Sequence, residues 1–185
     1  MSRSIPASVL SMGLLASSAV WAAAPAPIGA VDADRMMGRW YEILRAPNKL
    51  QKNCFAAYQQ WSKQGDTYAI QQVCHRDSPT GEVAQVGATA KPLNREHTLF
   101  DASFLGGLVH RQYEVTDHAA DYSWVISTTS DGRFPKLLSR NPTMPASEQA
   151  ALKSRMARLG FDISRLESCS DATASASAGS PQPAG

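Results

Sequence analysis

Three cysteines, Cys54, Cys74 and Cys169, are the residues of this 185-residue sequence with the clearest capacity for chemistry. They could supply a nucleophilic thiol or form one disulfide. A nucleophilic thiol needs a lowered pKa, which a neighbouring base or cation provides. His75 adjoins Cys74, but successive residues of a strand point to opposite faces, so His75 would not reach that thiol. The sequence contains no recognisable Ser, His and Asp set and no paired carboxylates. The cysteines therefore favour a disulfide over catalysis.

A disulfide between Cys54 and Cys74 fits the hairpin that the sequence predicts around them. Lys63-Gln64-Gly65 suits a three-residue hairpin loop, with Ser62 and Asp66 opposed on either side of it. The two cysteines are equally far from this loop and would be opposed too, with their Cα atoms about 4.5–5.5 Å apart. A Cys54–Cys169 bridge is the alternative. Either pairing leaves one thiol, which could stay free or join two chains.

Charged and metal-binding side chains give weaker indications. Arg45, Lys49 and Lys52 could meet a carboxylate or phosphate group, or could form a solvated cluster. His97 and His110 stand apart without ligand spacing, so we expect no metal and no cofactor. With 18 basic and 16 acidic residues the net charge is only +2, which argues against nucleic acid as a partner. A hydrophobic content of 43% is enough for a folded core.

The two ends of the chain read as segments outside the folded unit. Residues 1–22 predict a secretory signal peptide, with Arg3 at its start, a short apolar run and a cleavage site after Ala22. The run is too short to span a bilayer, so we expect no integral membrane span in the mature chain. No cysteine lies near the cut to carry a lipid anchor. We expect an exported protein, periplasmic or secreted, with a linker at 23–33, one domain at 34–169 and a disordered tail at 170–185.

The body of the chain predicts an all-β fold with one helix near its end. Short segments rich in β-forming residues are separated by turn signals, which is typical of an antiparallel barrel or sandwich. The expected strands cover 39–46, 54–62, 66–75, 82–91, 96–104, 109–116, 121–129 and 134–140. A helix should run from Pro145 to Gly160, with Leu152, Met156 and Leu159 as its apolar stripe. Residues 161–166 could add an edge strand.

Four short motifs, in the right order, carry a resemblance to a known family. Gly38-Arg39-Trp40-Tyr41-Glu42-Ile43 resembles the signature that opens lipocalins, and 48–54 resembles the following loop of apolipoprotein D-like bacterial lipocalins. Thr116-Asp117 with Asp121-Tyr122 resembles the second lipocalin motif, split here by inserted residues. Residues 137–142, which include Arg140, resemble the third. The resemblance covers about 34–166.

This resemblance implies an eight-stranded antiparallel up-and-down barrel that is closed at one end and has one C-terminal α-helix. Trp40 would plug the closed end, with Arg140 over its ring. The resemblance gives structural roles to the motif residues Gly38, Trp40, Asp117, Tyr122 and Arg140. A barrel of eight strands holds one small ligand.

Alternation along the strands predicts which side chains line such a barrel. The expected ligand-binding residues are Ala56, Tyr58, Ile70, Gln72, Ala88, Phe100, Ala102, Phe104, Tyr113, Val115 and Trp124. Gly87 could mark a bulge that changes the alternation in its strand. The lining suits a fatty acid, lysophospholipid or similar amphiphile. We therefore expect a non-catalytic carrier, with a cavity-cysteine enzyme acting on a lipid-like substrate as the alternative. Contact with a membrane surface and the choice between monomer and dimer stay open.

Overall fold

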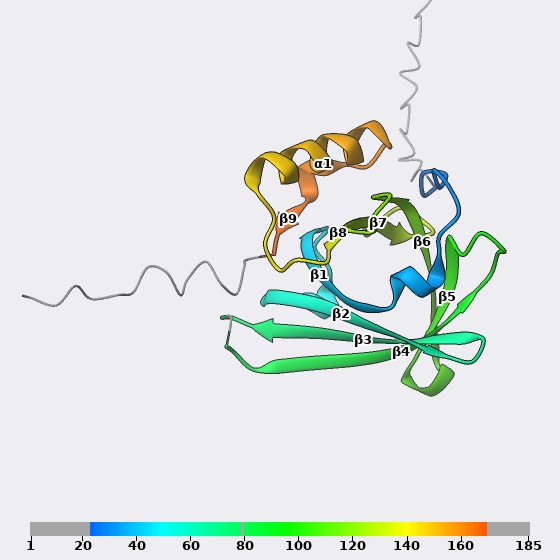
Figure 1. Ribbon diagram of the computed structural model, residues 1–185. Helices are drawn as coiled ribbons and strands as arrows, with labels where there is room; N and C mark the ends of the chain where they lie inside the picture. The colour runs from blue at the N-terminus through cyan, green and yellow to red at the C-terminus, as the bar shows by residue number, and fades with distance from the viewer. Residues whose placement is uncertain (1–22, 79, 170–185) are drawn as a thin grey trace, which may run out of the picture.

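The computed structural model describes residues 23–78 and 80–169, which form a curved sheet of nine strands with one α-helix outside it (Figure 1). The strands are β1 (Gly38–Arg45), β2 (Cys54–Gln64), β3 (Thr67–Arg76), β4 (Val83–Pro92), β5 (Leu99–Phe104), β6 (Val109–His118), β7 (Trp124–Thr129), β8 (Lys136–Ser139) and β9 (Glu167–Ser168). The helix α1 spans Ala146–Arg158, and short 3-10 helices are η1 (Ala33–Met36), η2 (Lys49–Gln51), η3 (Leu105–Gly107) and η4 (Ile163–Arg165). No helix among these residues is long and apolar enough to cross a membrane.

The sheet closes on itself because β1 pairs with β2 along one edge and with β8 along the other. All of these pairings are antiparallel, and β2 to β8 follow one another in sequence order. The predicted eight-stranded up-and-down barrel is therefore confirmed. All eight expected strands are present, although β5 begins at Leu99 rather than at Glu96.

The predicted edge strand at 161–166 is wrong. That stretch contains η4, and the additional strand β9 comes immediately after it. Asp162 caps η4, because its carboxylate accepts a hydrogen bond from the Ser164 backbone N–H at 3.0 Å. β9 then pairs with Leu44 and Arg45, on the edge of β1 that β2 covers only as far as Tyr41. The C-terminal strand therefore continues the sheet where β2 leaves β1.

The β2–β3 hairpin has a different register from the one that its loop residues suggested. Gln64 is opposite Thr67, so the turn consists of Gly65 and Asp66, with Gly65 at φ +58°. Glycine at the first position of a two-residue turn adopts this left-handed conformation without strain. A bulge at Phe55 then places Cys54 opposite Arg76, while Ala57 is opposite Cys74. The sequence predicted that the two cysteines are directly opposed, but in the structure they are diagonal neighbours.

The predicted Cys54–Cys74 disulfide is nevertheless present, with a Cα–Cα separation of 5.5 Å. The extra residue of the bulge brings Cys54 within reach of its partner. Cys169 is the remaining free thiol and is buried. Burial raises the pKa of the Cys169 thiol to about 12.

We expect peptide mapping without reductant to find Cys54 linked to Cys74, and the Cys169 thiol to resist alkylation until the chain is unfolded. Burial keeps the reagent away, and a thiol with a pKa of about 12 holds almost no thiolate at neutral pH. Mass spectrometry after iodoacetamide treatment should find no label on the folded protein and one label on the unfolded protein. A peptide that links Cys169 to Cys54 would contradict this assignment.

The helix α1 covers one outer face of the barrel (Figure 1). Leu152 and Met156 are buried there and Leu159 is partly buried, which confirms the predicted stripe as core packing. Their partners across the interface include Ile43, Leu44, Ile126 and Leu137. Gly160, at φ +98°, ends the helix as predicted.

The segment predicted as a linker is attached to the barrel by backbone hydrogen bonds. Ile28 donates to Thr116 at 3.0 Å and Val31 donates to Glu96 at 2.7 Å. Val31 and Ala33 are buried. The packed unit therefore begins before Asp34. The expected signal peptide at 1–22 and the tail at 170–185 lie outside the described residues.

Candidate functional site

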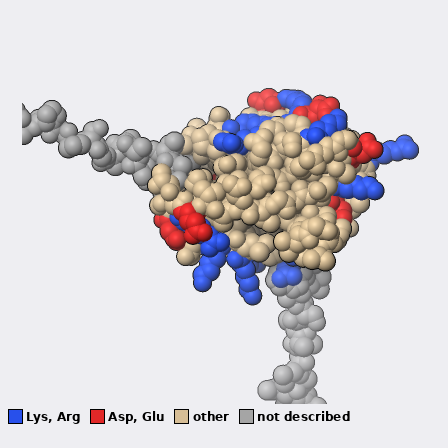
Figure 2. Space-filling model, turned by 90° about the horizontal axis from the view of Figure 1, so that it is seen from below, with Lys and Arg blue, Asp and Glu red and all other residues tan. Residues whose placement is uncertain are grey.

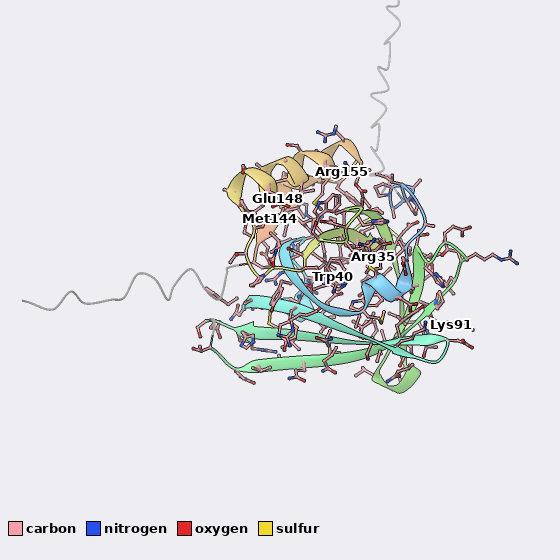
Figure 3. The ribbon with its side chains drawn as sticks, viewed as in Figure 1. Arg35, Trp40, Lys91, Met144, Glu148 and Arg155 are labelled. Carbon is pink, nitrogen blue, oxygen red and sulfur yellow. A yellow bond between two sulfur atoms is a disulfide. The ribbon has the colours of Figure 1, made fainter. Side chains whose placement is uncertain are left out.

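The closed end of the barrel is plugged by Trp40, which is fully buried (Figure 3). Its indole Nε1 donates a hydrogen bond to the Met36 carbonyl oxygen at 2.8 Å, and the Arg140 guanidinium lies 3.6 Å from its ring centroid. Arg140 also donates to the carbonyl oxygens of Arg39 and Arg35. Gly38 has φ +94°, and a side chain there would approach Arg140. The motif residues therefore lock this end.

Two further motif residues tie other segments to the barrel wall. Tyr122 accepts a hydrogen bond through its hydroxyl from the Asp32 backbone N–H at 2.6 Å, and Arg35 lies over its ring. Asp117 is buried and pairs with Arg155 of α1, which Figure 3 labels on the outer side of the barrel. These contacts join Tyr122 to the segment before β1 and Asp117 to α1.

The lower interior is filled by a cluster of aromatic rings. Phe100 is buried and meets Trp61 at 5.7 Å and Tyr68 at 6.0 Å between ring centroids, both edge to face. Trp40, Val115 and Ala90 belong to the same cluster. This packing forms a solid floor above the plug.

The upper interior is more open. Residues directly opposed across antiparallel strands share a face, and Ala88 is opposite both Ile70 and Phe104. Ile70 packs against the aromatic cluster, so this row faces inward. Its members are only half-buried, as are the inward Val86 and Tyr113. Solvent therefore reaches these side chains from the open end of the barrel.

Most of the predicted lining residues share the interior. The structure turns eight of them inward: Ile70, Gln72, Ala88, Phe100, Ala102, Phe104, Tyr113 and Val115. Phe100, Ala102 and Val115 are buried in or beside the floor, whereas the other five lie where solvent enters. Gly87 marks no bulge, since the β3–β4 register is continuous across it.

Three predicted lining residues lie on the outer surface of the barrel instead. The bulge at Phe55 reverses the alternation along β2, so Ala56 and Tyr58 face outward, and Arg39 lies over the Tyr58 ring at 4.2 Å. Trp124 also faces outward and packs in the cluster beneath α1. On β7 the inward side chain is its neighbour Val125. The sequence-based placement of these three residues is therefore wrong.

A buried polar network near the mouth was missed by the sequence analysis. Glu42 is inward-facing and buried, and it accepts hydrogen bonds from Lys136 Nζ at 2.5 Å and from Gln51 Nε2 at 2.6 Å. Arg45 lies 3.4 Å from the same carboxylate. Burial alone would raise the pKa of Glu42, but the charge and hydrogen bond of Lys136, with Arg45 and Gln51, lower it. The motif that begins at Gly38 places Glu42 two residues after Trp40, so alternation along the strand could have identified Glu42 as inward-facing.

The network anchors the β1–β2 loop at the edge of the mouth. Gln51 is the buried residue of η2, while its neighbour Leu50 is exposed. A hollow of about 720 Å³ lies beside this loop and β9. The three cations predicted near the mouth, Arg45, Lys49 and Lys52, all border it. Arg45 is already engaged, because it bonds to Glu167 at 2.9 Å and to the Cys54 carbonyl at 2.7 Å.

The two histidines considered as metal ligands lie on different elements: His97 is half-buried in the loop before β5, and His110 is exposed on β6. His110 Nδ1 is 2.7 Å from the Asp101 carboxylate, on neighbouring strands. In the described part of the chain, no three His, Cys, Asp or Glu side chains gather as a metal site would require.

Comparison with known proteins agrees with this geometry. The family model described as a lipocalin-like domain matches residues 31–171. Mouse (Mus musculus) apolipoprotein D is 28% identical over 144 residues, which is 73% of this chain and 74% of that protein.

Solved structures with the same fold come from several arthropods. Lobster apocrustacyanin A1 has a TM-score of 0.59 at 12% identity, covering 80% of this chain and 91% of its own. The cockroach allergen Per a 4 gives 0.61 at 13%, covering 78% and 91%. Insecticyanin from the tobacco hornworm Manduca sexta gives 0.61 at 14%, covering 78% and 82%. With the family model matched across nearly the whole described barrel, the chain belongs to the lipocalin-like family.

Proposed function

We propose that this protein binds and carries a small hydrophobic or amphiphilic ligand, of the fatty acid or lysophospholipid class, without chemical conversion. The observation that carries the proposal is the contrast inside the barrel. A packed aromatic floor around Phe100 lies below an upper interior whose inward side chains, among them Ala88, Val86 and Phe104, are only half-buried. Small side chains among them leave room that larger ones would fill.

The lining chemistry supports an acyl chain. Each methylene moved from water into such an interior contributes about 0.8 kcal/mol before the costs of binding. The polar network of Glu42, Lys136 and Arg45 lies near the mouth of the same interior, where a head group would remain. An amphiphile would fit this interior with its acyl chain directed to the apolar floor and its head group beside the polar network at the mouth.

The alternative of a cysteine enzyme has no supporting geometry. Cys54 and Cys74 are joined, and Cys169 has a raised pKa where a nucleophile needs a lowered one. We also propose that the protein works after export, in the cell envelope or outside the cell. The signal-like residues 1–22 and the disulfide support this location, since disulfides persist in oxidising compartments.

We expect Ala88→Phe to weaken ligand binding by about tenfold or more, because the new ring would occupy the interior space that the acyl chain needs. Ala56→Phe adds the same volume on the outer face of β2 and should leave binding unchanged. Calorimetric titration of both delipidated variants with a medium-chain fatty acid and with a lysophospholipid would measure this. Equal losses in the two variants would contradict the inward placement of Ala88.

Native mass spectrometry of protein purified from its own export compartment tests the proposal more directly. An added mass of a few hundred daltons that is removed by delipidation and restored by one of these amphiphiles would support it. If no species is bound and no amphiphile is taken up, the carrier function is wrong.

A further inference from the structure

One edge of the barrel wall is unpaired. The strand β5 pairs with β4 only along Ala88–Pro92, so in the described part of the chain no strand covers β4 from Val83 to Gly87 on that side. Figure 1 shows this half of β4 running beyond the barrel with only β3 beside it. The open edge is five residues long, or about 17 Å.

The backbone groups along this edge are available for pairing. The Arg76 N–H donates to the Glu82 carbonyl at 2.9 Å, one position beyond the opposed pair of His75 and Val83, so that position has the orientation of a hydrogen-bonded pair. Such pairs alternate along antiparallel strands, so Ala84 and Val86 bond to β3. The N–H and C=O groups of Val83, Gln85 and Gly87 therefore point to the open edge.

The usual protection of a free edge is missing here. Natural edge strands carry lysine, proline or a bulge to prevent pairing with another chain. The stretch from Val83 to Gly87 has no charge and no proline, and its register with β3 is continuous. The outward residues of β3 beside it, Ala69, Gln71 and Val73, are also uncharged, and Gln71 bonds to Gln85 at 3.1 Å. Figure 2, seen from that side, shows a broad uncharged area with charged groups toward its margins.

We infer that β4 pairs with β4 of a second copy of this chain, antiparallel and around a twofold axis at Gln85. In this arrangement Val83 would face Gly87 of the other copy and Ala84 would face Val86. Each larger side chain would meet a smaller one, and the two Gln85 amides could bond to each other. The turn before Val83 and the start of the β5 pairing at Ala88 limit the new ladder to the same five residues in both copies.

The same segment also fits itself better than it fits an arbitrary peptide. A twofold pair uses one surface twice, so its volume complementarity follows from a single sequence. Because a ladder of five residues buries little surface, we expect a reversible dimer that forms with rising protein concentration.

Sedimentation velocity over a micromolar to submillimolar concentration series would test this inference on three proteins. The natural chain should shift from monomer to dimer. Gln85→Lys places two like charges in contact across the axis and should remain monomeric throughout. Gln71→Lys adds the same charge to the same face one strand away, and should still dimerise. A natural chain that stays monomeric, or a Gln85→Lys dimer, would overturn the inference.

Oxidative cross-linking would locate the interface. Gln85→Cys should form a covalent dimer, because opposed residues of a hydrogen-bonded pair have Cα atoms about 5.5 Å apart, within disulfide range. Gln71→Cys should not, because two additional strand spacings separate the copies there. The natural cysteines are joined or buried and give no cross-link of their own. Equal cross-linking of both variants would overturn the β4 pairing.

Discussion

Trp40→Ala should lower the free energy of unfolding by about 3–5 kcal/mol, the range for removing a large aromatic ring from a packed core. Trp40 is fully buried, its indole bonds to Met36, and Arg140 lies over its ring. The substitution removes all three contributions and opens the closed end. Urea unfolding followed by circular dichroism would measure the loss as a lower midpoint.

The matched control for this prediction is Trp124→Ala. Trp124 is half-buried on the outer face, packed in the cluster beneath α1. Removing it takes away the same side chain without opening the interior, so the loss of stability should be clearly smaller. If the two variants lose equal stability, Trp40 is not the plug that its contacts indicate.

Glu42→Gln should cost about 3 kcal/mol at neutral pH, because it leaves Lys136 and Arg45 near the mouth without their shared carboxylate. Glu167 still reaches Arg45, so Lys136 loses most. The double replacement Glu42→Leu with Lys136→Met removes both partners and should recover much of the loss. Urea unfolding of both variants and the natural chain gives the comparison.

The effect of Glu42→Gln should depend on pH with a definite sign. The pKa of Glu42 is lowered in the folded protein below its ordinary value of 4.5, so the carboxylate stabilises the fold above that pH. This stability is lost as the pH falls through the lowered folded pKa. The difference between natural and Glu42→Gln proteins should therefore shrink in acid. A difference that stays constant down to the acid transition would contradict an ionised Glu42.

The sequence predicted the barrel well because turn residues and short motifs are local signals. Pro92, Gly132 and the residues around Trp40 each mark an end or an entry of a strand, and the structure has strands there. The helix was equally clear, since its apolar stripe and Gly160 agree. Such features need only the residues that form them.

The lining of the site was harder to predict because it depends on the count of residues along each strand. One additional residue at Phe55 reverses β2, which moved Tyr58 outward and brought Trp61 inward. Nothing in the local sequence marks that bulge. The placement of Trp124 was wrong for another reason. The first half of β7 is apolar on both faces because α1 covers its outer side, so alternation could not choose between them.

The double pairing of β1 also determines the order in which the molecule can assemble. Adjacent strands from β2 to β8 meet across short connections, but β1 must find β8 nearly one hundred residues later, as in the pair of Tyr41 and Ser139. Closing so long a loop costs entropy before any contact repays it, and distant contacts slow folding. The disulfide spans a sequence separation of only 20 within one hairpin and cannot shorten that search. We expect the β1–β8 seam to be the last part of the barrel to form. Until this seam closes, the aromatic floor of a newly made chain stays exposed to water.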